Sequence, residues 1–184
     1  MTPLSTVDRA TIRIAFEALG ELLRAPDESF GERLSEALSV FTLQSSGNAA
    51  LEAFAEEIVV LDRAAQQAAW NAAFGRAGMC SPLLGVHLFG DGKAARERLV
   101  ARLRDDFRKG GVDADAIETP DAIAEVLSFA GRFEDEEWAE LGHRVLRPAL
   151  TRMSALLPSG PTPYRHLIGA ALELAKEAFP AADR

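Results

Sequence analysis

The chain has 184 residues and a formal net charge of −8, from 20 lysines and arginines against 28 aspartates and glutamates. This balance excludes a nucleic-acid binder with a broad basic surface, because phosphate contacts need clustered Lys and Arg. The single cysteine, Cys80, excludes an internal disulfide and any multi-cysteine zinc or iron–sulfur site. A chain of this length fits one domain with its own hydrophobic core.

The composition favours helices over strands. Ala, Leu, Arg and Glu are frequent and form helices readily, whereas there is one tyrosine and few Val or Ile. The first residues do not combine a basic region with a long apolar core, and no window of about 18 apolar residues exists. We therefore expect an all-α cytoplasmic protein with neither a cleaved leader nor a membrane span.

Apolar residues recur at helical spacing in four segments of the N-terminal half. "APDES" separates the first segment from the second, and "QSSGN" separates the second from the third, as turn-forming sequences do. The expected helices run through Ile12 to Leu23, over residues 27–43, through Leu51 to Leu61, and over "AAQQAAWNAAF", which ends at Gly75.

The next three expected helices begin after "GRAGMCSP". Ser81 and Pro82 resemble a cap and a first helical residue, and they open a short helix through "SPLLGVHLF". A long amphipathic helix is predicted over Lys93–Lys109. After the linker "GGVDADAIETP", Thr119 and Pro120 have the same cap-and-proline pattern and predict another helix start.

Two further helices complete the chain. "FEDEEW" places acidic residues at the start of a helix, where the dipole favours them, and that helix continues through Leu141, Leu146 and Leu150. "LPSGPTP" breaks it before a last helix with Leu167 and Ile168 on one face, and residues 180–184 are expected to fray. The sequence thus predicts a single compact all-α domain over residues 1–184, with eight or nine helices.

Catalytic and metal-binding patterns are weak. The histidines are far apart and have no HExxH spacing, and "FGDGK" lacks the cradle of a phosphate-binding loop. Cys80 and His87 could form a nucleophile pair, although a small buried or loop cysteine is the commoner case. The run Glu134–Glu137 lacks the glycine turn of a calcium loop and fits a solvated helix start. We expect no catalytic residue, metal or cofactor.

Three features stand in a particular order along the chain. Trp70 and Phe74 are one helical turn apart and share a face. His87 and the Phe89-Gly90-Asp91 sequence close the next helix, and Pro120 with Asp121 opens a third. Core aromatic residues and helix caps explain each feature separately, but they do not explain the ordered combination.

That combination resembles the redox-enzyme maturation chaperones, which include the nitrate reductase delta-subunit assembly chaperones and their trimethylamine-oxide and dimethyl-sulfoxide reductase relatives. The core of the resemblance runs from Trp70 to Phe129, and "LLRAPDESFGERL" and "YRHLIGAALELA" extend it over most of the chain. One position departs from the family pattern. The family's Pro-Asp-His-Leu reads Pro120-Asp121-Ala122-Ile123 here, so the histidine is absent.

The resemblance implies an all-helical, non-catalytic, cytoplasmic chaperone. Members bind the apo catalytic subunit of a molybdenum and iron–sulfur oxidoreductase, often through an N-terminal leader that carries a twin-arginine signal. They hold it until the molybdopterin cofactor is inserted, before assembly or export. The resemblance also allows a monomer or a dimer that exchanges helices, with "GGVDADAIETP" as the hinge.

A leader with an apolar stretch and two arginines needs an apolar groove with an acidic rim. We expect Trp70 and Phe74 to supply rigid apolar area, and Asp91 and Asp121 to pair with arginine. His87, Phe89 and Pro120 complete the predicted peptide-binding set, which is taken from the resemblance. The alternatives are a helical scaffold or regulatory protein without a molybdoenzyme client, and a small helical enzyme. A bound metal or small molecule would favour the enzyme.

Overall fold

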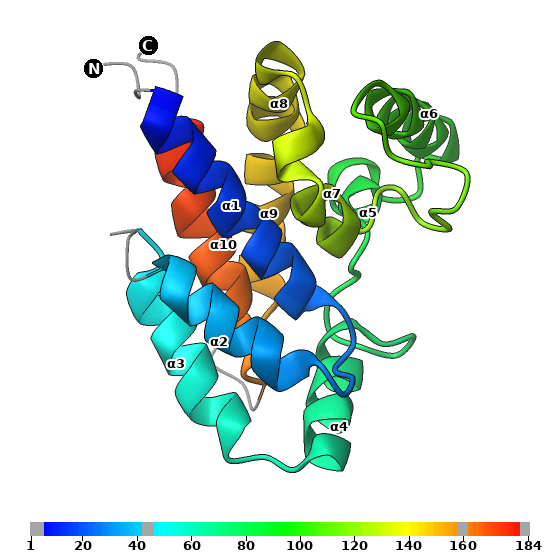
Figure 1. The fold of residues 1–184 in the computed structure, drawn as a ribbon. Helices are drawn as coiled ribbons and strands as arrows, with labels where there is room; N and C mark the ends of the chain where they lie inside the picture. Colours follow the sequence, from blue (N-terminus) through cyan, green and yellow to red (C-terminus); the bar gives the residue numbers. More distant parts are fainter. Residues whose placement is uncertain (1–5, 42–45, 158–161, 181–184) are drawn as a thin grey trace.

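Helices form all the regular elements in the residues that the computed structural model describes, which are 6–41, 46–157 and 162–180 (Figure 1). The all-α prediction is therefore confirmed. The elements are α1 (Thr6–Leu23), α2 (Phe30–Phe41), α3 (Asn48–Val59), α4 (Arg63–Phe74), α5 (Leu84–Phe89), α6 (Lys93–Lys109), α7 (Ile123–Ser128), a 3-10 turn (Ala130–Arg132), α8 (Asp135–Leu141), a π-helical turn (Gly142–Leu146), α9 (Arg147–Leu156) and α10 (Tyr164–Ala178).

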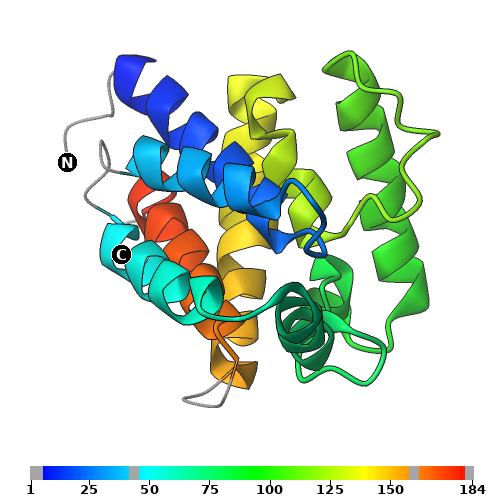
Figure 2. The same ribbon diagram turned by 60° about the horizontal axis from the view of Figure 1, so that its bottom comes forward.

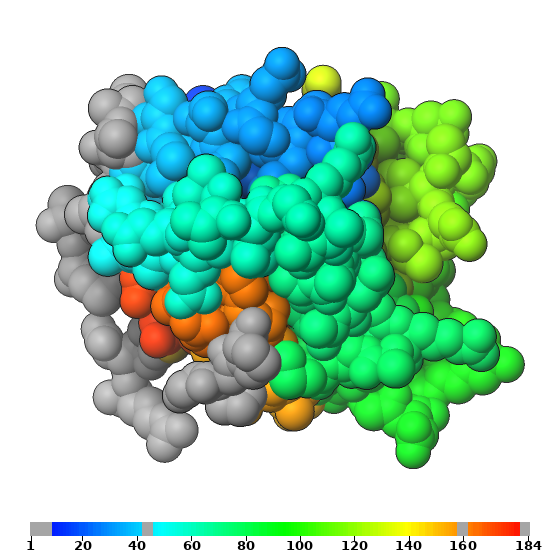
Figure 3. Space-filling model, turned by 90° about the horizontal axis from the view of Figure 1, so that it is seen from below, coloured from blue at the N-terminus to red at the C-terminus, as the bar shows by residue number. Residues whose placement is uncertain are grey.

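Helix α10 lies between α3 and α9, and α1 packs across it (Figure 2). α1 also packs closely along α7, and Gly20 permits this approach, because a Cβ at that position would lie 2.4 Å from the backbone nitrogen of Ser128. The surface of α2, α3 and α4 is continuous when seen from below (Figure 3). α6 lies at the far side of the molecule from α3 and contacts α5 (Figure 1).

One continuous hydrophobic cluster links these helices. The stripes predicted from helical spacing point into it, as Leu19, Leu34, Leu103 and Leu167 show. Phe16 stacks on Phe179 and meets Trp138 edge-on, with ring centroids 6.1 and 5.4 Å apart. Burial of large side chains of this kind stabilises a fold by roughly 1.5–3 kcal/mol each.

Two predicted helix starts are wrong. α5 begins at Leu84 and not at Pro82, and α7 begins at Ile123 and not at Pro120. The Ser81 hydroxyl accepts a hydrogen bond from the backbone of Leu83 in a local turn, ahead of the helix. The cap-and-proline pattern therefore marks an extended or turn segment at both places.

The two segments pair with each other across the chain, and we call residues 82–84 and 121–123 the neck. Leu83 and Ala122 form an antiparallel bridge. The backbone N–H of Leu84 donates to the carbonyl of Asp121 at 2.8 Å, and the first N–H of α7 donates to Pro82 at 2.9 Å. The carbonyl of Asp121 thus accepts from the first amide of α5, and the carbonyl of Pro82 accepts from the first amide of α7. Amides at a helix start have no acceptor within their own helix.

The start of α2 also differs from the prediction, which placed it at Asp27. The Asp27 carboxylate instead accepts hydrogen bonds from the backbone and the hydroxyl of Ser29, at 3.0 and 2.8 Å, and the helix begins at Phe30. Aspartate often makes this local turn in place of a helical conformation.

The helix predicted after "FEDEEW" contains a π-helical turn that the sequence did not indicate. α8, this turn and α9 run without interruption, so the described residues hold nine helices when the run is counted once, in agreement with the prediction. The turn begins at Gly142, against which the ring of Phe179 packs, and a Cβ there would lie 2.2 Å from that ring. Pro148 follows, and it cannot donate the hydrogen bond of a regular helix.

In the described part of the chain, no helix is both long and apolar enough to cross a lipid bilayer. The tail that was expected to fray lies outside the described residues from position 181 onward.

Candidate functional site

Asp121 is a buried internal anchor. Its side chain is 1% exposed, and it accepts hydrogen bonds from Arg96 Nε at 3.0 Å and Arg96 Nη2 at 3.3 Å. It also accepts a bond from the backbone N–H of Gly85 at 3.3 Å, so it caps α5 from the other side of the neck. The hydrogen bond to Asp121 raises the pKa of Arg96. The expectation that Asp121 pairs with a partner's arginine does not fit this arrangement, because the carboxylate is already occupied and inaccessible.

Gly85 and Arg96 are structural partners of Asp121 that the sequence analysis missed. A Cβ at Gly85 would lie 2.7 Å from Arg96 Cγ and 2.8 Å from Asp121 Oδ2. The glycine therefore leaves room for the arginine to cross α5. A glycine inside a short apolar helix was the only available signal, because Arg96 precedes its partner by 25 residues.

Trp70 and Phe74 share a face, as predicted, and that face points into the protein. Their rings are 6.1 Å apart and edge-on, and Phe74 meets Tyr164 edge-on at 5.3 Å. Phe74 is 4% exposed, and the half-buried Trp70 donates from its indole to the carbonyl of Leu23 at 2.9 Å. This pair fastens α4 to the core, so Phe74 offers no surface to a ligand in this conformation.

His87 and Cys80 lie close together but do not form an activated nucleophile. His87 Nε2 is 2.7 Å from the carbonyl of Ser81 and 3.8 Å from Cys80 Sγ. A carbonyl can only accept, so Nε2 carries the proton and cannot also take one from the thiol. Burial raises the pKa of the Cys80 thiol to about 11, which keeps it protonated near neutral pH.

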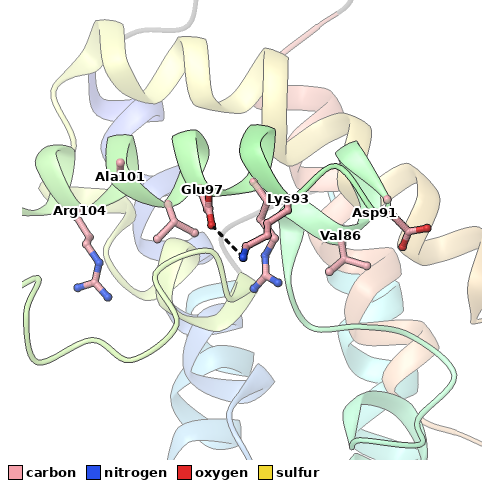
Figure 4. A pocket seen from close by; sticks show the side chains of 9 residues that line it. Val86, Asp91, Lys93, Glu97, Ala101 and Arg104 are labelled. Atoms are coloured by element: carbon pink, nitrogen blue, oxygen red, sulfur yellow. Dashed lines mark ion pairs between the residues drawn. The ribbon is translucent and has the colours of Figure 1, made fainter.

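An open groove of about 770 Å³ lies along α6 beside α5 (Figure 4). This volume is within the range of sites for small molecules or side chains of a peptide. Val86, Val100 and Ala101 supply its apolar surface. The other lining residues are Gly90, Asp91, Lys93, Arg96, Glu97 and Arg104.

Most charges of the groove are paired. Lys93 lies 3.9 Å from Glu97, one helical turn away. Arg96 is held by Asp121, and Arg104 Nη1 donates to the carbonyl of Ala114 at 2.5 Å. Asp91 is exposed, and its carboxylate forms no ion pair or hydrogen bond with any described residue. Asp91 lies at one end of the row of labelled side chains and Arg104 at the other (Figure 4).

The structure brings only part of the predicted peptide-binding set to this groove. Asp91 lines the groove, and Phe89, which is 39% exposed, lies two positions before Asp91 in the sequence. His87 is 8% exposed, and Pro120 is buried directly before the neck. Trp70 and Phe74 belong to the core and do not line the groove.

No group of three or more His, Cys, Asp or Glu side chains is arranged to hold a metal ion in the ranges that the structure describes. The sequence matches no model of a known protein family and no curated protein.

Proposed function

We propose that this protein is a maturation chaperone that binds the apo catalytic subunit of a molybdenum oxidoreductase through its N-terminal leader. The chaperone holds the subunit until the molybdopterin cofactor is inserted, before assembly and export. The groove along α6 receives the leader. Its apolar surface takes one or two aliphatic side chains of the leader, and Asp91 pairs with an arginine.

The groove with its unpaired carboxylate is the observation that supports this proposal. Lys93 pairs with Glu97 and Arg96 pairs with the buried Asp121, so Asp91 supplies the unpaired charge at its end of the groove. A carboxylate can hold a guanidinium through two hydrogen bonds, which are stronger than hydrogen bonds between neutral groups. The groove also lies beside the His87 to Asp91 segment, on which the family resemblance partly depends.

A labelled leader peptide tests the proposal directly. The peptide has about 25 residues, two consecutive arginines and a following apolar stretch, and its binding is measured by fluorescence anisotropy. We expect Asp91→Lys to raise Kd about tenfold, which corresponds to one charge-assisted contact of about 1.4 kcal/mol. Val100→Glu should weaken binding as well, because it places a charge on the apolar surface of the groove.

Two variants on α3 serve as matched controls. Glu56→Lys makes the same charge change as Asp91→Lys, and Val59→Glu makes the same change as Val100→Glu, both at exposed positions outside the groove. If each groove variant binds the leader as tightly as its control does, the groove does not receive it. A leader in which both arginines are alanine should lose the difference between Asp91→Lys and Glu56→Lys.

The client is identified in the native host during anaerobic respiratory growth. A tagged chain should recover a large molybdoenzyme subunit, and deletion of that subunit's leader should abolish the recovery. If candidate clients are expressed and none is recovered, the alternative of a helical scaffold or regulatory protein takes precedence.

A further inference from the structure

A second, smaller groove lies between α1 and α2, on different helices from the groove along α6. Its apolar residues are Ile14, Ala18 and Val40, and its volume is about 120 Å³. Ile14 is 50% exposed although it lies within an amphipathic helix. An apolar cavity of 150 Å³ can hold a molecule of benzene, so this one is large enough for a single aliphatic side chain.

Carboxylates surround this cavity. Glu17, Glu21 and Glu36 line it together with one cation, Arg33. Helical spacing explains the arrangement, because positions 14, 17, 18 and 21 share one face of α1 and positions 33, 36 and 40 share one face of α2.

The negative charge of the rim is not balanced by its neighbours. Glu17 accepts its hydrogen bond from a neutral amide, the backbone N–H of Gly131. Glu21 shares Arg24 with Glu125, so one cation serves two carboxylates. The exposed Glu36 forms no ion pair with a described residue.

Arg33 does not cancel this excess, because its positive charge is already paired with Asp27, although its Nε and Nη2 have no hydrogen-bond partner among the described residues. Its guanidinium Nη1 lies 3.1 Å from the Asp27 carboxylate, and its side chain is only 14% exposed. The rim therefore presents a local excess of negative charge directly beside an apolar cavity.

We propose that the α1–α2 groove binds a cationic amphipathic helix of a partner protein. One aliphatic side chain of that helix enters the cavity between Ile14, Ala18 and Val40. Lysines or arginines three and four residues away then meet Glu17, Glu21 and Glu36. A helix fits this groove because, when helices pack, a side chain of one helix enters a hole between the residues of the other. The residues three and four positions from that side chain lie on the same face of the partner helix, so they reach the rim of the groove.

Charge decides between the possible occupants. A second copy of the chain would bring another acidic surface of a protein with net charge −8, and like charges across an interface repel each other. A membrane surface carries anionic lipids, which the same carboxylates repel. A cationic helix is the occupant whose charge and apolar stripe complement this groove. This inference depends on the α1–α2 surface alone and not on the proposed function.

The test uses a synthetic peptide of leucine, alanine and lysine, about 18 residues long so that it can form a helix alone, with leucine on one face and lysine on the other. It has no arginine pair, and its binding is measured by fluorescence anisotropy. We expect Glu36→Lys to raise Kd about fivefold to tenfold, because it replaces an attractive charge by a repulsive one. Ile14→Ser should raise Kd about threefold or more through lost apolar contact, with no change of charge.

The controls separate this groove from general attraction to an acidic protein. Glu56→Lys changes the charge equally on α3, outside this groove, and we expect less than about a twofold effect of it. A peptide of the same composition with scrambled order should bind weakly. The proposal is overturned if Glu36→Lys and Glu56→Lys have equal effects, if Ile14→Ser has none, or if the scrambled peptide binds equally well. Circular dichroism and thermal unfolding show whether each variant is folded, and Ile14 and Glu36 are exposed enough for the fold to tolerate the changes.

Discussion

Removing the two partners of the Arg96–Asp121 ion pair one at a time should have unequal costs. Arg96→Ala leaves the Asp121 carboxylate, 1% exposed, with the 3.3 Å bond from Gly85 as its main support. An uncompensated buried charge of this kind costs about 3–5 kcal/mol of the free energy of unfolding. Asp121→Ala leaves the arginine, whose side chain is 36% exposed and can turn to water. Asp121→Ala mainly removes the acceptor of the Gly85 backbone N–H and should lower the free energy of unfolding by about 1–3 kcal/mol.

Urea unfolding followed by far-ultraviolet circular dichroism measures both free energies. We expect Arg96→Ala to be the less stable variant by roughly 1–2 kcal/mol, or several degrees in Tm at about 2–4 °C per kcal/mol for a chain of this size. The double variant should be more stable than Arg96→Ala alone, because no buried charge is left. The reasoning is refuted if Asp121→Ala is at least as destabilising as Arg96→Ala, or if the two single effects add in the double variant.

Three further predictions concern stability and reactivity. Gly85→Ala should cost about 1–3 kcal/mol in urea unfolding, because the added methyl displaces the buried ion pair; an unchanged midpoint would contradict the close packing. At pH 8 the Cys80 thiol, with a pKa of about 11, should react with iodoacetamide roughly a hundredfold more slowly than in urea, and equal rates would mean that the thiol is accessible. Burial alone would raise the pKa of Glu57, but hydrogen bonds from His166 and Arg165 outweigh it and lower that pKa below 4.5. The resulting stabilisation is present above the unfolded pKa and is lost as pH falls through the folded pKa, so Glu57→Gln should lose less stability than the wild type between about pH 5 and 3; parallel curves would refute the pairing.

The sequence predicts most of the helices because a repeated apolar spacing depends on many residues at once. The bounds of α6 match the expected Lys93–Lys109, for example. The predicted starts of α5 and α7 are wrong because the cap-and-proline pattern at Pro82 and Pro120 is equally compatible with an extended segment. The pairing of Leu83 with Ala122, 39 positions apart in sequence, selects the extended form. The residues around either position alone do not indicate this pairing.

The candidate site was less predictable than the fold for the same physical reason. The spacing of Trp70 and Phe74 indicates a shared face but not whether that face is covered, and the contact with Tyr164 covers it. The chemistry of Asp121 allows an arginine partner, and the one it has lies within the same chain. Asp91 lines the groove along α6 and pairs with no described cation, and its pairing with an arginine of a partner stays a prediction.

The neck brings together the two ends of the segment that carries α5 and α6. That segment also packs against the rest of the domain, through the ring of Phe107 on Phe129 and through the ion pair of Arg102 with Glu140. The chain leaves the body at Leu83 and returns at Ala122, next to where it left, so the intervening length does not have to span a fixed distance between α4 and α7. One turn added near Lys93, ahead of these contacts, would lengthen the groove by about 5.4 Å without moving the neck. Proteins with this fold could therefore change the length of the groove by an insertion in the segment between the two halves of the neck, while α1, α3 and α10 keep their packing.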